Sequence, residues 1–304
     1  MDWVRVKRKL IDQRYLLLMV IPGIIWMLIF NYTPMYGVII AFKDYKITKP
    51  ISEAEWVGLK HVIEFFQDSR FWLILKNTLG ISFLKLIIGF PLPILFAIML
   101  NEIRNNRFKK GIQTISYLPH FLSWVVLGGI MITWLSESGL ANELLLELGI
   151  IKEPIPFMAK ADYFWGVVII SEIWKELGWN AIIYLAAISG IDQSMYEAAT
   201  VDGAGRWRKI WNITLPSIVG TITILLILAV GNMMNSNFDQ IFVLKNTLNA
   251  DASDVIDIFV YRMGIQSGRF SFATAAGLFK SVTAVILLVS TNFIVKKINN
   301  TSLF

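Results

Sequence analysis

The chain has 304 residues, of which 56% are apolar, and its mean hydropathy is +0.60. Soluble domains are close to half apolar, so this excess indicates that lipid is part of the solvent. The absence of cysteine excludes disulfides, thiolate metal sites and cysteine nucleophiles. The net charge of +6 lies in clusters beside apolar runs, which is typical of a membrane protein with basic cytoplasmic segments and not of a nucleic-acid-binding protein.

Six apolar runs are long enough to cross the ~30 Å hydrocarbon layer as helices. Basic residues precede the first run, as in a signal peptide, but the run is too long and has no small-residue cleavage site, so we expect an uncleaved span. Residues 43–70, 136–162 and 245–270 are too polar to cross, and we expect a surface helix at 141–148. The six predicted spans are residues 15–42, 71–100, 113–134, 163–190, 217–244 and 271–297.

An even number of spans places both termini on the same side of the membrane. The connecting segments that would then lie inside carry more lysine and arginine than the longer segments outside, which predicts cytoplasmic N- and C-termini. The predicted fold is therefore an all-α integral membrane protein. It consists of a cytoplasmic segment 1–14, a six-span domain 15–297 and a cytoplasmic tail 298–304.

A polar, basic stretch separates the fourth and fifth apolar runs. Ser194 and Glu197 stand at the spacing of a capping box, which predicts that a short helix begins there. Gly203 and Gly205 allow that helix to end and the chain to turn. Pro216 suits the first turn of a following helix, where a missing N–H has no consequence. A compact helical element of this kind, held between two spans, is suited to contact another protein.

This stretch, residues 192–216, reproduces the EAA loop of ABC importer permeases. The chain resembles the carbohydrate permeases of the maltose type, in the branch that serves complex oligosaccharides and polysaccharide fragments, over nearly its whole length. The resemblance implies a type I ABC importer permease in the bacterial cytoplasmic membrane that works by alternating access. It also implies that the loop seats in a groove on an ATPase through Tyr196, Glu197, Ala198, Ala199, Asp202, Gly203, Ala204, Ile213, Leu215 and Pro216.

The same resemblance implies an assembly around this chain. No P-loop is present, so ATP and magnesium would be bound by two separate ATPase subunits, and this chain would be neither an enzyme nor a cofactor-binding protein. The other expected partners are a second homologous permease, an extracytoplasmic sugar-binding protein, an oligosaccharide and the lipid bilayer, with no nucleic acid.

The fourth apolar run carries four polar or aromatic residues at the spacing of one helix face, namely Glu172, Lys175, Glu176 and Trp179. Charges inside a span cost about 2.5–3.5 kcal/mol each, so they should face a cavity or one another. Carboxylates and ammonium groups bind hydroxyls and an indole stacks on a sugar ring, which predicts a sugar-lined pathway. The alternative is that the charges pair among themselves or against the second permease.

The fifth run carries a second polar cluster, in which Asn232, Ser236 and Asp239 are predicted to share a helix face with Met233 beside them. Such groups either join helices or line a pathway. In maltose-type permeases, residues at these distances from the EAA loop line the sugar site. Lys85 and Lys280 also interrupt spans and receive no predicted function, and His120 is expected to be structural.

Three other classes of protein fit parts of the pattern. A secondary transporter would need repeats with discontinuous helices and its own ion-coupling site, which the sequence does not indicate. An ABC permease for phosphate, amino acids or metals would share the loop, but the carboxylates of the fourth run disfavour an anionic ligand. A membrane enzyme would need a nucleophile–base pair or a metal cluster.

Overall fold

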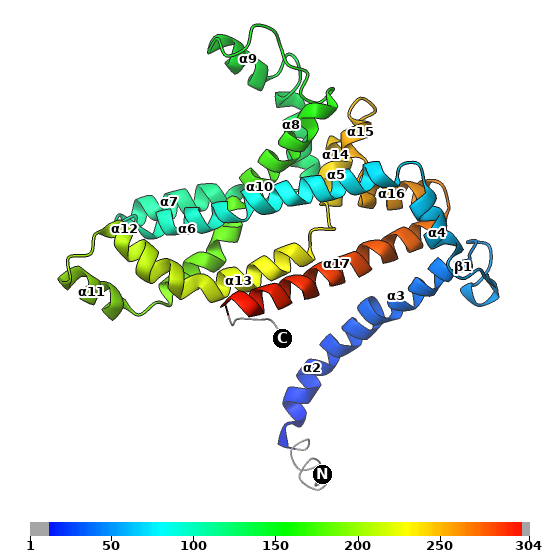
Figure 1. The fold of residues 1–304 in the computed structure, drawn as a ribbon, viewed down its shortest axis with the longest axis horizontal. Helices are drawn as coiled ribbons and strands as arrows, with labels where there is room; N and C mark the ends of the chain where they lie inside the picture. Colours follow the sequence, from blue (N-terminus) through cyan, green and yellow to red (C-terminus); the bar gives the residue numbers. More distant parts are fainter. Residues whose placement is uncertain (1–11, 300–304) are drawn as a thin grey trace. The chain divides into compact units, whose positions relative to one another are not determined.

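The computed structural model describes residues 12–299, which form helices, with one two-stranded hairpin in that range. Two predicted segments lie largely outside the described residues: most of the cytoplasmic segment 1–14 and all but the start of the tail 298–304. The basic residues outside the described range at the N-terminal end are Arg5, Lys7, Arg8 and Lys9. The chain divides into two compact units, which are described one after the other (Figure 1).

The first unit contains residues up to Gln67 together with Met263–Leu278. Its hairpin pairs Lys43 with Trp56, and the Trp56 ring stacks on Phe42 with 5.7 Å between ring centroids. No residue of its first helix is buried. Its elements are α2 (Arg14–Met27), η1 (Leu28–Tyr32), α3 (Thr33–Met35), η2 (Tyr36–Phe42), β1 (Lys43–Asp44), η3 (Ile51–Glu53), β2 (Glu55–Trp56) and α4 (Lys60–Gln67).

The second unit contains Asp68–Arg262 and the residues from Phe279 onward. Two elements, η7 (Arg262–Gln266) and α17 (Phe270–Asn299), contain residues of both units. The others are α5 (Phe71–Leu84), η4 (Lys85–Gly89), α6 (Pro91–Asn101), α7 (Asn106–Tyr117), η5 (Leu118–Phe121), α8 (Trp124–Trp134), α9 (Leu140–Glu147), α10 (Ala161–Ser189), α11 (Gln193–Val201), α12 (Arg206–Lys209), η6 (Ile210–Thr214), α13 (Leu215–Gly231), α14 (Phe238–Leu244), α15 (Ala250–Ser253) and α16 (Ile256–Tyr261).

Within the described residues, three helices contain a π-helical turn that ends two residues before a proline. The turns are η1, η4 and η6, and the prolines are Pro34, Pro91 and Pro216. A proline inside an α-helix leaves the carbonyl four residues earlier without a partner and clashes with it. In each case that carbonyl belongs to the middle residue of the π turn, so the wider turn makes room for the ring. Pro216 lies in the first turn of α13, as predicted, and η6 joins α13 to α12 in one continuous helix that begins at Arg206.

Four helices are long and apolar enough to cross a membrane, and a bent pair raises the number to five at most within residues 12–299. The six spans predicted from the sequence are thus not all recovered by length and composition. The four helices are Arg14–Phe42, Phe71–Asn101, Arg206–Gly231 and Phe270–Lys297.

Helix α10 is long enough to span but is not among these four. Its 29 residues correspond to a length of ~43 Å at 1.5 Å per residue. Any stretch of 18 residues within it contains Glu172, Lys175 and Glu176, so every stretch of spanning length includes all three charges. Whether α10 can cross a membrane therefore depends on whether these three charges have partners.

The predicted third and fifth spans are both interrupted. The third bends by 99° between the segments Asn106–Phe121 and Trp124–Trp134. Residues 113–134 therefore do not form one straight helix. The fifth begins earlier than predicted, at Arg206, and ends at Gly231. Residues 232–237 then form a non-helical break before α14.

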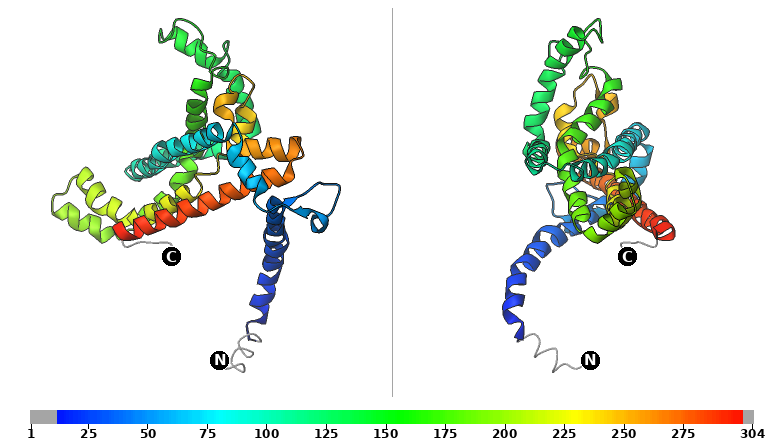
Figure 2. Two further views of the ribbon diagram at one scale, coloured as in Figure 1. Left: turned by 45° about the vertical axis from the view of Figure 1, so that its right-hand side comes forward. Right: turned by 90° about the vertical axis from the view of Figure 1, so that its left-hand side faces the viewer.

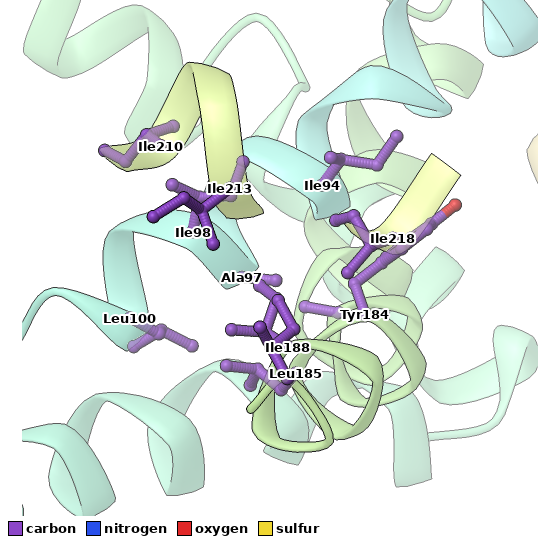
Figure 3. Packing of buried hydrophobic residues seen from close by; sticks show 12 residues of the cluster. Ile94, Ala97, Ile98, Leu100, Tyr184, Leu185, Ile188, Ile210, Ile213 and Ile218 are labelled. Carbon is purple, nitrogen blue, oxygen red and sulfur yellow. The ribbon is translucent and has the colours of Figure 1, made fainter. Parts of the chain in front are cut away.

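The core of the second unit lies where α6, α10 and α13 pack together (Figures 1 and 2). Figure 3 shows this cluster, in which isoleucine and leucine side chains of α6, α10, η6 and α13 lie close together with Tyr184 at one side. Tyr196 and Ala199 of α11 pack against its edge, so the loop after α10 is attached to the same core. A second cluster joins the first half of α10 to α5, α14 and α16.

Candidate functional site

A cavity of about 250 Å³ lies in the second unit beside the middle of α10. Its walls come from α5, η4 and α6 on one side, from α10, and from the end of α13 with the break that follows. The polar residues that line it are Ser82, Lys85, Glu172, Glu176, Asn180, Asn232 and Asn235, and its apolar residues include Phe90, Leu177 and Met233.

Glu172 forms an ion pair with Lys85, which projects from the π turn η4. The Lys85 ammonium also donates a hydrogen bond of 3.2 Å to Gln240 Oε1. Gln240 is fully buried and donates in turn to the Val168 carbonyl at 2.7 Å and to Ser171 Oγ at 2.9 Å. A buried chain of polar contacts thus connects the cavity wall to α14 and the core of α10.

Glu176 lies one helical turn after Glu172 and contacts the break between α7 and α8. Its Oε2 is 2.7 Å from Nδ1 of His120, and its Oε1 is 3.4 Å from Nζ of Lys175. The His120 ring stacks on Trp179 with 4.1 Å between centroids and 3° between planes. Trp179 therefore orients His120 and is not among the residues that line the cavity.

Lys175 is buried and points away from the cavity. Its Nζ donates to the carbonyl of His120 at 2.5 Å and lies 3.5 Å from the carbonyl of Pro119. Both carbonyls lie near the C-terminal end of η5, where a cation interacts favourably with the helix dipole. The Pro119 carbonyl also accepts from the N–H of Leu122 at 3.2 Å. Lys175 thus stabilises the sharp bend of the third predicted span.

The single face predicted for the fourth run is therefore two rows in the structure. Glu172, Glu176 and Asn180 follow one another at intervals of four and line the cavity. Lys175 and Trp179, also four apart, contact η5 instead. The two carboxylates line the cavity and also form ion pairs, and their contact with a sugar stays a prediction. Asn180 continues the spacing of the carboxylates and could have been found from the sequence.

The break after α13 divides the predicted polar cluster. Asn232 and Met233 line the cavity, whereas Ser236 is fully buried and Asp239 is exposed on α14. The predicted shared face of Asn232, Ser236 and Asp239 is wrong, because the chain is not helical between the first two. Asn237 has φ 59°, a left-handed conformation that asparagine tolerates better than most residues.

Asp257 of α16 fixes this break. Its Oδ2 accepts a hydrogen bond of 3.1 Å from the backbone N–H of Ser236, and its Oδ1 pairs with Lys280 of α17. Lys280, which has no predicted function, thus positions the Asp257 carboxylate, and this carboxylate in turn binds the backbone of the break. No sequence signal pairs these residues, because they are far apart in the chain.

The loop 192–216 has the local structure that its glycines predict. Helix α11 ends in a Schellman motif, in which the N–H of Gly203 donates to the Thr200 carbonyl at 3.1 Å and that of Ala204 to the Ala199 carbonyl at 2.8 Å. Gly203 has φ +74°, and Asp202 is the exposed C-cap. The N-cap is Asp192 and not the predicted Ser194, because the Asp192 carboxylate accepts from the N–H of Ser194 at 2.9 Å.

Helix α11 has one attached face and one exposed face. The Tyr196 hydroxyl lies 2.9 Å from that of Thr214, and Ala199 packs against the core cluster. On the other face Glu197, Ala198 and Val201 are exposed, and Val201 retains 89% of its accessible surface. The helix thus presents small and apolar side chains outward from a firmly held inner face.

Two contacts connect this loop to the rest of the second unit. Arg206 forms an ion pair of 3.0 Å with Glu102, at the end of α6, and Lys209 donates to Thr200 Oγ1 at 2.7 Å. Ile213 is buried in the core cluster and Leu215 packs against it, while Pro216 is exposed. The loop, α6 and α13 are therefore joined by a salt bridge and by apolar packing.

Three comparisons relate this chain to known proteins. Residues 89–300 match the family model described as "Binding-protein-dependent transport system inner membrane component". The chain is 44% identical over 301 residues to the polygalacturonan/rhamnogalacturonan transport system permease protein YteP of Bacillus subtilis (strain 168), covering 99% of this chain and 93% of that protein. It is 29% identical over 236 residues to the lactose transport system permease protein LacF of Rhizobium radiobacter, covering 76% of each.

Among solved structures, the fold is similar to a chain of a bacterial alginate ABC transporter in complex with an alginate pentasaccharide-bound periplasmic protein. The TM-score is 0.89 and the identity 40%, with 98% of this chain and all of that chain covered. The family match, the relatives and the structural likeness confirm the resemblance carried by the EAA loop. The chain belongs to the family of binding-protein-dependent transport system inner membrane components.

Proposed function

We propose that this chain is the permease subunit of an ATP-driven importer for oligosaccharides that carry carboxylate groups. The observation that carries the proposal is the 40–44% identity, over nearly the whole chain, to a permease named for polygalacturonan and rhamnogalacturonan and to a transporter described as importing the acidic polysaccharide alginate. Both names refer to sugar polymers with acidic residues. The sequence alone did not distinguish acidic from neutral sugars.

The cavity supports a sugar ligand of this kind. Three asparagine amides, Asn180, Asn232 and Asn235, supply donors and acceptors for hydroxyl groups, and Lys85 supplies a cation for a carboxylate. Glu172 and Glu176 are already paired with cations or with His120, so they repel an anionic sugar less than free carboxylates would. A volume of about 250 Å³ is small for an oligosaccharide, so we propose that a second permease completes the site.

We propose that transport proceeds by alternating access. An extracytoplasmic binding protein would deliver the sugar, and two ATPase subunits carrying ATP and magnesium would drive the cycle. The exposed face of α11 would seat in a groove on an ATPase subunit, because helix-in-groove contacts use small and apolar residues. Movement of the loop would reach α6 through the Arg206–Glu102 ion pair and α13 through the continuous helix that begins at Arg206.

We further propose six crossings of the bacterial cytoplasmic membrane, with both termini in the cytoplasm. Helix α10 would be the fourth crossing because each of its central charges has a partner, which lowers the cost of placing them in a membrane. The bent pair α7–η5 and α8 would be the third crossing, with its freed carbonyls satisfied by Lys175.

The test is uptake by the assembled transporter. The chain would be expressed with its candidate permease, ATPase and binding-protein partners, purified, and reconstituted in liposomes with ATP inside. We expect uptake of tetragalacturonate that requires ATP and the binding protein, and an ATPase subunit that co-purifies with this chain. Uptake that continues without ATP, or a chain that purifies with no ATPase subunit, would contradict the proposal.

A further inference from the structure

A second pocket of about 290 Å³ lies in the second unit, at the end of α14 and along α15 and α16. It is separate from the cavity beside α10 and shares no lining residue with it. Its polar lining consists of Lys245, Asn246, Thr247, Ser253, Asp254 and Arg262. With two cations and one carboxylate, the lining carries a net positive charge.

Asp254 is buried at 3% exposure and is only half satisfied. Its Oδ2 accepts from both Arg262 at 2.8 Å and Arg70 at 3.0 Å. Its Oδ1 has no hydrogen-bond donor within the part of the chain that the structure describes. A buried carboxylate oxygen without a donor is costly, so a ligand hydroxyl that donates to it would stabilise the site.

Lys245 is the cation of this pocket without a carboxylate partner among residues 12–299. Its ammonium lies 5.3 Å from the centre of the Phe242 ring and is half-buried. The guanidinium of Arg262, by contrast, is held by Asp254. Lys245 is therefore free to bind an anionic group of a ligand.

The wall of the pocket is fixed before any ligand binds. Asn246 Oδ1 accepts from the N–H groups of Leu248 and Asn249, at 2.8 and 3.0 Å. Asn249 is fully buried and donates to the carbonyls of Met158 and Leu244, at 3.1 and 3.2 Å. A loop ordered in this way loses little conformational entropy on binding.

We infer that this pocket binds one uronic acid residue of the oligosaccharide, with its carboxylate on Lys245 and a hydroxyl donating to Asp254 Oδ1. The hydroxyls of Thr247 and Ser253 suit the remaining sugar hydroxyls, which a protein carboxylate side chain would not need. This inference rests on the proposed import of acidic oligosaccharides. It adds a site, outside the cavity beside α10, that selects for the acidic group.

The experiment compares two probes that differ only in charge: tetragalacturonate and the same oligosaccharide with its carboxyl groups reduced to alcohols. In the reconstituted transporter, Lys245→Gln should lower kcat/KM for tetragalacturonate about tenfold, the effect of losing one charge-assisted hydrogen bond. Uptake of the reduced probe should be unchanged. Lys245→Arg should retain most activity, and Lys152→Gln, a change at an exposed lysine outside the pocket, should have no effect.

Equal losses for both probes, or no loss for either, would overturn the inference. A loss that depends only on docking of the binding protein, and not on the charge of its sugar, would assign Lys245 to an acidic side chain of that protein and would also overturn it. Direct binding separates the inference from the proposed function. Digalacturonate should raise the Tm of the purified transporter but not the Tm of the Lys245→Gln variant. If this shift in Tm is observed but the transporter takes up no sugar, only the proposed function is refuted.

Discussion

Lys175 shows how a charge can lie in an apolar helix for a structural reason. Its ammonium satisfies the carbonyls of Pro119 and His120 at the bend after α7 and pairs with Glu176. Removing it would leave the His120 carbonyl without this donor, whereas the Pro119 carbonyl would keep the N–H of Leu122 and Glu176 would keep His120. Lys175 is not among the residues that line the cavity, and its predicted place in a substrate pathway stays a prediction.

We expect Lys175→Met to destabilise the protein by about 1–3 kcal/mol, the cost of leaving the His120 carbonyl without its donor. The loss should appear as a lower Tm in detergent and as reduced uptake of acidic and neutral sugars alike. Lys152→Met, at an exposed position, is the matched control. An unchanged Tm with a selective loss of acidic sugar uptake would instead place Lys175 in contact with the substrate.

Gly203 and Gly205 are two residues apart and differ in backbone conformation. Gly203 has φ +74°, and a Cβ added there would meet no other group within 4 Å, so a substitution is opposed by the backbone alone. Gly205 is the N-cap of α12 and has φ −70°, which any residue adopts. Only the first glycine is required by the turn.

We expect Gly203→Ala to destabilise the turn by about 1–2 kcal/mol, the cost of the left-handed conformation for a residue with a Cβ. Gly203→Pro should abolish transport and uncouple ATP hydrolysis, because it also removes the N–H bound to Thr200. Insertion into the membrane should remain intact in both variants. Gly205→Ala is the control, and normal uptake by Gly203→Pro would count against a coupling role for the loop.

At the scale of elements, helix ends and interruptions carry much of the organisation. The three π turns before prolines allow long helices to continue where an α-helix would break. The bend after η5 and the break after α13 both border the cavity region, and each is held by a charged side chain from another helix. Broken helices can therefore be stable when a neighbouring element satisfies their backbone groups.

The N-cap of α11 should depend on pH. The hydrogen bond from the backbone N–H of Ser194 lowers the pKa of Asp192 below its usual ~3.9. Because the folded pKa is the lower one, the contribution to helix stability is fully present above about pH 4 and is lost as the pH falls through the folded value.

Hydrogen exchange of the Ser194 amide, corrected for the intrinsic pH dependence of exchange, should therefore become less protected below about pH 4. The cap in Asp192→Asn should persist without this dependence, since an asparagine side chain caps in the same way without titrating. Asp192→Ala should show low protection at every pH. Equal protection in all three proteins would show that the carboxylate does not cap the helix.

At the scale of the molecule, the absence of cysteine makes the proposed topology directly measurable. Val201, on the exposed face of α11, and Lys152, between α9 and α10, fall on opposite sides in the proposed arrangement. Single cysteines at these positions report their side of the membrane through a maleimide reagent that cannot cross it.

We expect Val201→Cys to be labelled only in inside-out vesicles, and more slowly when the ATPase subunits are bound. Lys152→Cys should be labelled only in intact cells with the outer surface accessible. Labelling of both positions from the same side would contradict the proposed number of crossings between them. Labelling of Val201→Cys from outside would contradict the orientation of the whole chain.

The sequence alone determined the class of protein, the local structure of the loop 192–216 and most helix positions, because these depend on local composition and on short spacings. Gly203 favours a turn through its own backbone freedom, and apolar runs must be buried in lipid or in a protein core. The surface helix predicted at 141–148 corresponds to α9, shifted by one residue.

Only the tertiary structure decided which polar residues face the cavity. Lys85 and Glu172, or Asp257 and Lys280, become partners because helices distant in the chain pack side by side. The spacing that put Glu172 and Lys175 on one face could not separate them, since a helix face is wide enough to border both a cavity and a neighbouring helix. The breaks at 118–123 and 232–237 likewise depend on donors and acceptors from other helices, which no local pattern records.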